Sequence, residues 1–85
     1  MTDSTLLADV ADSVRFVARI PPEVAITGDS LLVEDLAIDS LDLVGIFLKI
    51  QDQYDVAIND DDVPGLRRVA DLAQYVARHR GSAAA

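Results

Sequence analysis

The residues Asp39-Ser40-Leu41-Asp42 are the strongest candidates for chemistry in the chain. Asp39 stands where a helix N-cap belongs, and Asp42 can reach back to complete an acidic variant of the capping box. Ser40 is then the first helical residue, beside backbone N–H groups that lack helical partners and at the positive end of the helix dipole. That position accommodates a phosphate group well. Taken alone, however, these four residues favour the simpler interpretation that Asp39 caps a helix and Ser40 has no chemical role.

The remaining sequence offers little for catalysis or metal binding. The chain has no cysteine, and therefore no thiolate nucleophile, disulfide or cysteine metal site. A serine hydrolase is disfavoured because there is no Gly-x-Ser-x-Gly motif and because His79, near the end of the chain, is the only histidine. A calcium site at residues 59–62 is disfavoured because consecutive acids do not supply the alternating ligands of an EF-hand loop. We therefore expect no catalytic residue and no metal site.

The net charge of −8 is concentrated in the middle of the chain. Residues 34–62 contain nine acidic residues and a single base, Lys49, whereas the six other acids are balanced by six arginines. Such a field repels nucleic acid and anionic membranes, and it steers basic protein surfaces toward this segment. A face that merely keeps the protein soluble is the plainer interpretation.

The size of the chain favours one domain with one thin core. We expect this domain to cover residues 1–80, followed by a flexible C-terminal tail at residues 81–85. No stretch reaches the roughly 18 to 20 apolar residues of a membrane span, and the acidic N-terminus lacks the basic residues of a signal peptide. We therefore expect a cytoplasmic monomer that does not insert stably into membranes.

Helical periodicity and breaks predict an all-α fold with four helices, a long first loop and a short third helix. Pro21-Pro22 ends the first helix, and the leucines of the following connection should pack it onto the core. Pro64-Gly65 ends the third helix quickly. The expected helices begin and end near residues 4–19, 40–54, 59–65 and 68–79.

Residues 32–44, with the sequence Leu-Val-Glu-Asp-Leu-Ala-Ile-Asp-Ser-Leu-Asp-Leu-Val, resemble the signature of acyl carrier proteins. In that family the serine of an Asp-Ser-Leu triplet accepts 4′-phosphopantetheine. The resemblance extends to residues 54–58, to the acids opening the third helix and to residues 69–76, so it covers roughly residues 5–78. It changes the interpretation of Ser40 from a bystander to an attachment site.

The resemblance implies a four-helix bundle without catalysis of its own. A phosphopantetheinyl transferase would attach the arm of coenzyme A to Ser40, which Asp39 and Leu41 flank, and the thiol of the arm would carry acyl groups. Partners would be acyl-processing enzymes such as synthases, acyltransferases or acyl-ligases, in fatty acid, lipid or polyketide-type biosynthesis. They would dock on the second helix, and the implied docking residues are Asp39, Leu41, Asp42, Val44, Leu48 and Asp52.

The family shelters acyl chains between its helices, because each buried methylene contributes about 0.8 kcal/mol. The implied pocket residues are Leu32, Ile46, Ile50, Ile58, Val63, Leu66 and Val69. These residues are also ordinary core positions.

Several positions depart from the family pattern. Ala37 stands where a glycine usually precedes the signature, a change that a loop tolerates if the backbone φ is negative. Gly45 and Gln51 replace acids that are usual in fatty-acid carriers, and Lys49 adds a base, which favours a carrier dedicated to a particular pathway. Arg67 and the neighbouring Arg68 replace the threonine-type cap often seen before the last helix.

Two alternatives remain open. The chain could carry aminoacyl or peptidyl groups on the same fold and the same arm, although the acidic segment 34–62 and the Asp-Ser-Leu-Asp sequence favour acyl groups. It could also be an interaction subunit that is never modified.

Overall fold

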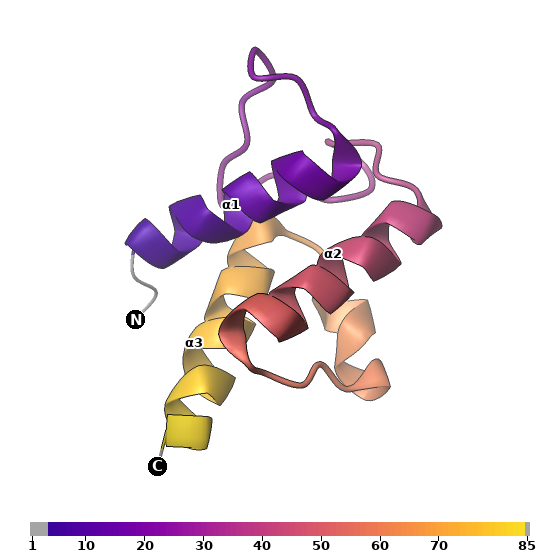
Figure 1. Cartoon of the computed structure of the whole chain (residues 1–85). Helices are drawn as coiled ribbons and strands as arrows, with labels where there is room; N and C mark the ends of the chain where they lie inside the picture. The colour runs from indigo at the N-terminus through magenta and orange to yellow at the C-terminus, as the bar shows by residue number, and fades with distance from the viewer. Residues whose placement is uncertain (1–3, 85) are drawn as a thin grey trace.

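The computed structural model describes residues 4–84, and within them the chain forms three α-helices and one 3₁₀ helix (Figure 1). The described residues contain no strand, only an isolated antiparallel bridge between Leu31 and Arg68. The predicted all-α architecture is therefore confirmed. The helices are α1 (Ser4–Ala18), α2 (Ser40–Tyr54), η1 (Asp60–Gly65) and α3 (Val69–Ala84).

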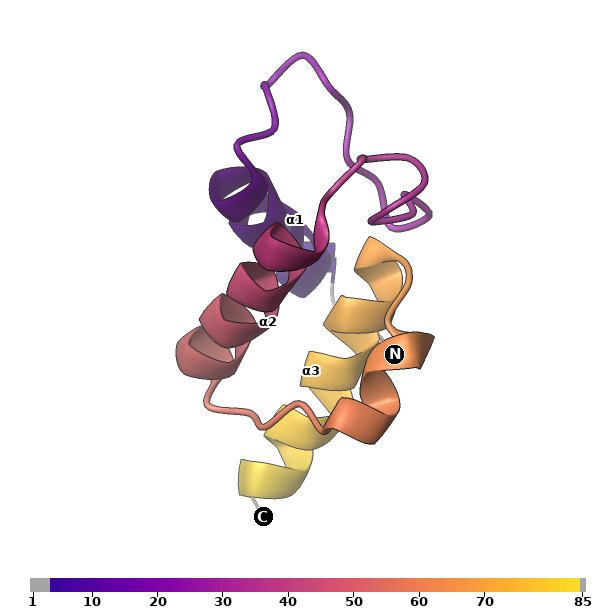
Figure 2. The same cartoon turned by 90° about the vertical axis from the view of Figure 1, so that its right-hand side faces the viewer.

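The three long helices pack around one core, with α1 lying across both α2 and α3 (Figure 1). The connection between α1 and α2 rises above the helices and descends to the start of α3 before it enters α2 (Figure 2). The core draws on every α-helix and on the connection. Its buried apolar side chains are Leu6, Val10, Val14, Leu32, Ile38, Ile46, Ile50, Val56, Leu66, Val69, Leu72, Ala73, Tyr75 and Val76.

Hydrogen bonds to the first turn of α3 hold the long connection in place. The Leu32 N–H donates to the Arg67 carbonyl (2.8 Å), and the Val69 and Ala70 N–H groups donate to carbonyls of the connection (3.1 and 2.9 Å). The Asp71 carboxylate accepts from the N–H groups of Arg67 and Arg68 (3.1 and 3.0 Å). Asp71 therefore caps α3 from within, in place of the threonine that the family usually shows.

The predicted helix boundaries agree well at α1 and α2 and less well near the C-terminus. The third helix is a 3₁₀ turn that begins after Asn59 and ends at Gly65, as its acids and Pro64 indicated. The last helix continues to Ala84, beyond its predicted end at His79. Alanine is the strongest helix former, and the alanines that follow Gly81 favour this extension. The flexibility of residues 81–85 stays a prediction.

Candidate functional site

The N-terminus of α2 begins at Ser40, with Asp39 as its N-cap. The Asp39 backbone is extended (φ −79°, ψ 171°), and its Oδ1 accepts a hydrogen bond of 2.8 Å from the Asp42 N–H. The Leu43 N–H donates to the Asp39 carbonyl at 3.0 Å. The bond from the Asp39 N–H to the Asp42 carboxylate is not formed among the described residues. Only one half of the predicted capping box is therefore present.

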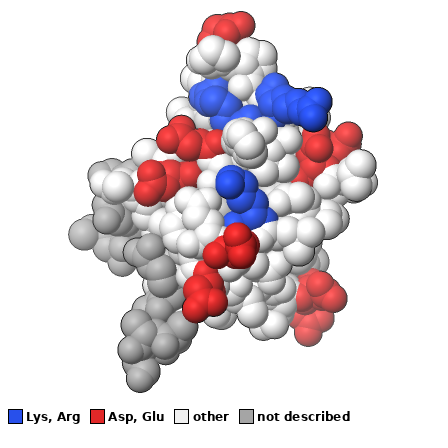
Figure 3. Space-filling model, viewed as in Figure 1, with Lys and Arg blue, Asp and Glu red and all other residues white. Residues whose placement is uncertain are grey.

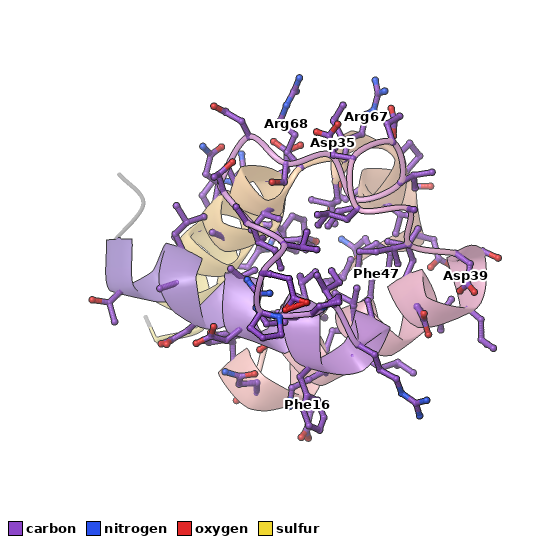
Figure 4. The ribbon with its side chains drawn as sticks, turned by 90° about the horizontal axis from the view of Figure 1, so that it is seen from above. Phe16, Asp35, Asp39, Phe47, Arg67 and Arg68 are labelled. Carbon is purple, nitrogen blue, oxygen red and sulfur yellow. The ribbon has the colours of Figure 1, made fainter. Side chains whose placement is uncertain are left out.

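The Ser40 side chain is exposed at this helix end. In the described part of the chain, the N–H groups of Ser40 and Leu41 have no hydrogen-bond partner. Two free donors and the positive end of the helix dipole thus surround the Ser40 hydroxyl, which is an arrangement that suits a phosphate group. Figure 4 shows the neighbouring Asp39 at the outer edge of the molecule. The site therefore fits a phosphodiester whose arm is accessible to large partners.

A tight turn positions this helix end. The Leu31 carbonyl accepts from the N–H groups of Asp35 and Leu36, both at 3.0 Å, and the Ile38 N–H donates to the Leu32 carbonyl at 3.1 Å. The turn buries Ile38 in the core, so that the next residues face solvent. Within it Ala37 has φ 53°, in the left-handed region. The negative φ under which a loop tolerates this alanine is therefore not found, and the alanine replaces the usual glycine at a cost of about 1 to 2 kcal/mol.

The helix α2 has one exposed and one buried apolar face. Leu41, Val44 and Leu48 are 78%, 54% and 60% exposed, whereas Ile46 and Ile50 are fully buried. Figure 3 shows a face of the molecule with much uncharged surface, on which acidic groups lie both near the edges and near the middle. Three apolar side chains are thus more than half exposed on the helix that begins at Ser40.

An exposed aromatic residue extends this surface onto α1, and sequence analysis did not identify it. Phe16 is 75% exposed, and the Lys49 Nζ lies 5.2 Å from the centre of its ring. Figure 4 shows that Phe16 projects from the side of the molecule opposite to Arg67 and Arg68. The sequence offers one indication, because Phe16 does not fall at helical spacing from the buried Val10 and Val14.

A cavity of about 300 Å³, here called the loop-side cavity, opens between the long connection, α2 and the end of η1. Glu34 and Arg67 form an ion pair of 2.8 Å at this cavity. Its apolar walls are Leu32, Val33, Leu43, Phe47, Val63 and Leu66.

A second cavity of about 300 Å³, here called the η1-side cavity, lies between α2 and the segment that leads into η1. It is formed by Val44, Phe47, Leu48, Gln51, Ile58, Asp60 and Val63. Phe47 and Val63 therefore contribute to both cavities.

The implied pocket residues divide between these cavities and the core. Leu32, Val63 and Leu66 line the loop-side cavity, and Ile58 lines the η1-side cavity. The three others, Ile46, Ile50 and Val69, are fully buried and line neither cavity. Phe47 lines both and was not among the implied residues, although an aromatic ring within an aliphatic helix could have drawn attention to it.

A further cavity, of about 510 Å³, lies next to Tyr75 and His79, whose rings stack with their centres 4.0 Å apart. The single proton of the Tyr75 hydroxyl lies within reach of Asp62 Oδ2 (2.9 Å) and the Ala57 carbonyl (3.2 Å), and the hydroxyl oxygen accepts from the Asn59 N–H (3.3 Å). Burial raises the pKa of Tyr75, and the Asp62 carboxylate adds to the shift. These contacts attach η1 to α3, which is a structural role.

Two further findings concern the described residues as a whole. Nowhere in residues 4–84 do three or more His, Cys, Asp or Glu side chains gather in a way that could hold a metal ion. None of the helices described is both long and apolar enough to cross a membrane.

Comparison with known proteins places this site in a family. The family model described as a phosphopantetheine attachment site matches residues 8–76. The meromycolate extension acyl carrier protein of Mycobacterium tuberculosis is 38% identical over 76 residues, which are 89% of this chain and 65% of that protein. The acyl carrier protein of Rhodococcus erythropolis is 37% identical over 75 residues, which are 88% of this chain and 81% of that protein.

The fold comparison agrees with the sequence comparison. The solution structure of a protein described as an acyl carrier protein from Anaplasma phagocytophilum superposes with a TM-score of 0.83 and 28% sequence identity. The match covers 92% of this chain and 91% of that structure.

Fold and sequence together place the chain among small helical proteins with a phosphopantetheine attachment site. The chain belongs to the acyl carrier protein family, whose covalent prosthetic group is 4′-phosphopantetheine. The family resemblance seen in the sequence is therefore confirmed. The chain spans 65% of the length of the mycobacterial relatives that it matches.

Proposed function

We propose that this protein carries acyl groups as thioesters on a 4′-phosphopantetheine arm attached to Ser40, and delivers them to enzymes of fatty acid, lipid or polyketide-type biosynthesis. The observation that supports this most is the exposed Ser40 hydroxyl at the start of α2, beside the free N–H groups of Ser40 and Leu41. A phosphopantetheinyl transferase would modify it in the cytoplasm, where we propose that the protein acts as a monomer.

Each residue at the site has a separate task in this proposal. The arm, when attached, supplies the thiol that holds the acyl group, because the chain has no cysteine of its own. Ser40 anchors the arm through a phosphodiester, and the free N–H groups of α2 stabilise its negative charge. Asp39 fixes the start of the helix by accepting from the Asp42 N–H. A cavity beside α2 shelters the acyl chain from water.

Partner enzymes would dock on the exposed face of α2, where Leu41, Val44 and Leu48 supply apolar contact and Asp39, Asp42 and Asp52 supply electrostatic steering. Burial of one leucine-sized side chain contributes roughly 1.5 to 3 kcal/mol, whereas an exposed charge pair contributes about 0 to 1 kcal/mol. Acyl transfer by Leu48→Ala should therefore be weaker than transfer by Asp52→Asn in steady-state kinetics at moderate salt. If Asp52→Asn proves the more damaging, the docking face has been assigned wrongly.

The docking face also supports a carrier dedicated to one pathway. Gly45 and Gln51 stand where acids are usual in fatty-acid carriers, and Lys49 adds a positive charge. Several relatives are described as meromycolate extension acyl carrier proteins, which is consistent with a dedicated lipid carrier. A dedicated partner would need fewer basic residues opposite α2 than a general fatty-acid enzyme.

The nature of the cargo is tested by loading the arm-bearing protein with two kinds of activating enzyme. An acyl-activating ligase and fatty acid should give an adduct of the expected mass that hydroxylamine releases as the acyl hydroxamate. An amino-acid-activating enzyme should give none. Loading by the second enzyme alone would establish the aminoacyl alternative, and a native protein that never acquires the arm would establish the unmodified subunit.

A further inference from the structure

The loop-side and η1-side cavities are separated by a common wall. Phe47 and Val63 are the two residues that line both cavities, and each cavity holds about 300 Å³. Phe47 lies on α2 and Val63 on η1, so both helices contribute to the shared wall. Figure 4 shows Phe47 well inside the molecule, with Arg67 at its outer edge.

We propose that Phe47, together with Val63, partitions the space beside α2 and thereby limits the length of the acyl chain that the protein shelters. The inference rests on the proposed function and names the specificity-determining residue of that function. The acyl chain occupies the loop-side cavity and stops at the Phe47 ring. Straight-chain acyl groups longer than this cavity extend into water or leave the protein.

The walls favour the loop-side cavity for the acyl chain. Leu32 and Leu66 belong to the core and are 1% and 8% exposed, and the charges of Glu34 and Arg67 neutralise each other at 2.8 Å. The η1-side cavity instead includes the polar side chains of Gln51 and Asp60. An apolar chain in the loop-side cavity therefore meets walls without net charge, whereas the walls of the η1-side cavity carry the charge of Asp60.

The volume sets the expected length. An apolar cavity of about 150 Å³ is sufficient for a benzene ring. The loop-side cavity has about 300 Å³ and therefore holds on the order of ten carbons. Phe47 packs against the core, and a helical aromatic side chain has few allowed rotamers. The partition is therefore expected to stay closed in the unmodified chain.

The test is to load the protein and Phe47→Ala with acyl-phosphopantetheine arms from butyryl, octanoyl, dodecanoyl and hexadecanoyl coenzyme A. The melting temperature is measured for each and compared with that of the same variant bearing the arm alone, which removes the effect of the substitution on the fold. In the parent protein we expect the increase to level off between octanoyl and dodecanoyl. In Phe47→Ala we expect it to continue through hexadecanoyl.

Methyl resonances report where the chain lies. Octanoyl should shift the Leu32 and Leu66 methyl signals in both proteins, whereas hexadecanoyl should shift the Ile58 methyl signals strongly in Phe47→Ala alone. Leu43→Ala is the matched control, because Leu43 lines only the loop-side cavity and its removal should leave the Ile58 signals unchanged. Phe47→Val serves if Phe47→Ala does not fold.

Two results would overturn the inference. One is a melting temperature that continues to rise through hexadecanoyl in the parent protein, and the other is a melting temperature that levels off at the same chain length in the parent and the Phe47 variants. Both results require that the arm has been attached. Failure of attachment, visible as an unchanged mass, would count against the proposed function instead.

Discussion

Ala37 shows how a single residue can carry strain beside a functional site. Its φ of 53° lies in the left-handed region, where a Cβ crowds the following carbonyl. The residue occurs two positions before Asp39, so the same turn that strains it directs the start of α2. The family's usual glycine at this position has no such conflict.

We expect Ala37→Gly to stabilise the protein. Relief of the left-handed conformation should exceed the entropy that glycine adds to the unfolded chain, for a net gain of roughly 0.5 to 1 kcal/mol. The change in the free energy of unfolding is measured by urea denaturation. Ala25→Gly is the matched control, because Ala25 is an exposed loop alanine without a positive φ and should lose stability on substitution. Equal effects at both positions would contradict the assignment of strain to Ala37.

Tyr75 should make stability fall at high pH. Burial raises the pKa of its hydroxyl, so above about pH 10 the unfolded chain loses a proton that the folded chain retains, and the unfolded state is favoured. Tyr75→Phe should cost about 1 kcal/mol at neutral pH by removing the hydrogen bond to Asp62. It should also flatten the decline above pH 10, as urea unfolding across the pH range would show. If the stability of Tyr75→Phe declines above pH 10 with the same slope as that of the parent protein, a group other than Tyr75 causes the decline.

At the scale of helices, the local sequence pattern was sufficient to predict a helix boundary where capping and burial indicated the same residue. The Asp39 cap and the apolar run after Ser40 predicted the bounds of α2, because capping and burial favour the same start. At α3 the side chain of Asp71 supplies the cap from inside the helix, so a search for a preceding threonine misses it. The positive φ of Ala37 depends on a turn closed by Leu31 and could not be derived from residue type alone.

The contact between α1 and α2 explains Gly45. A Cβ at this position would lie 3.1 Å from Val17 Cγ1, closer than ordinary van der Waals contact. Glycine in a helix interior costs roughly 1 kcal/mol relative to alanine, so the close approach of the two helices offsets a loss in helix propensity. The structure therefore supports close backbone approach as the reason for a glycine at position 45.

A double-mutant cycle tests this contact. Gly45→Ala alone should change the free energy of unfolding by less than about 0.5 kcal/mol, because the gain in propensity is offset by the crowding of Val17. In a Val17→Ala background the same change should stabilise by about 1 kcal/mol. Denaturant unfolding of the four proteins gives the coupling energy. A coupling near zero would mean that Val17 does not limit the size of residue 45.

For the molecule as a whole, the sequence predicted the family and the helices, but not the shape of the space beside α2. Periodicity separates the exposed Leu48 from the buried Ile50, because both lie on one helix. Which side chains enclose a cavity depends on how α2, η1 and the connection meet, and this is why Phe47 was missed while Ile46 was included.

The concentrated acidic charge should make the stability of the whole protein depend on ionic strength. Nine acids against one base within residues 34–62 repel one another, and salt screens that repulsion. We expect sodium chloride to raise the melting temperature, and magnesium chloride to act equally at matched ionic strength. A saturable rise with micromolar calcium that sodium does not reproduce would reveal a specific metal site and contradict the account.

The most direct test is the mass of the intact protein after incubation with coenzyme A and a broad-specificity phosphopantetheinyl transferase. The parent protein should gain the mass of one phosphopantetheine group, and peptide mapping should locate it on Ser40. Ser40→Ala should fold, as judged by circular dichroism, and keep its original mass. Modification of Ser40→Ala, or no modification of a folded parent protein, would contradict the assignment of Ser40 as the attachment site.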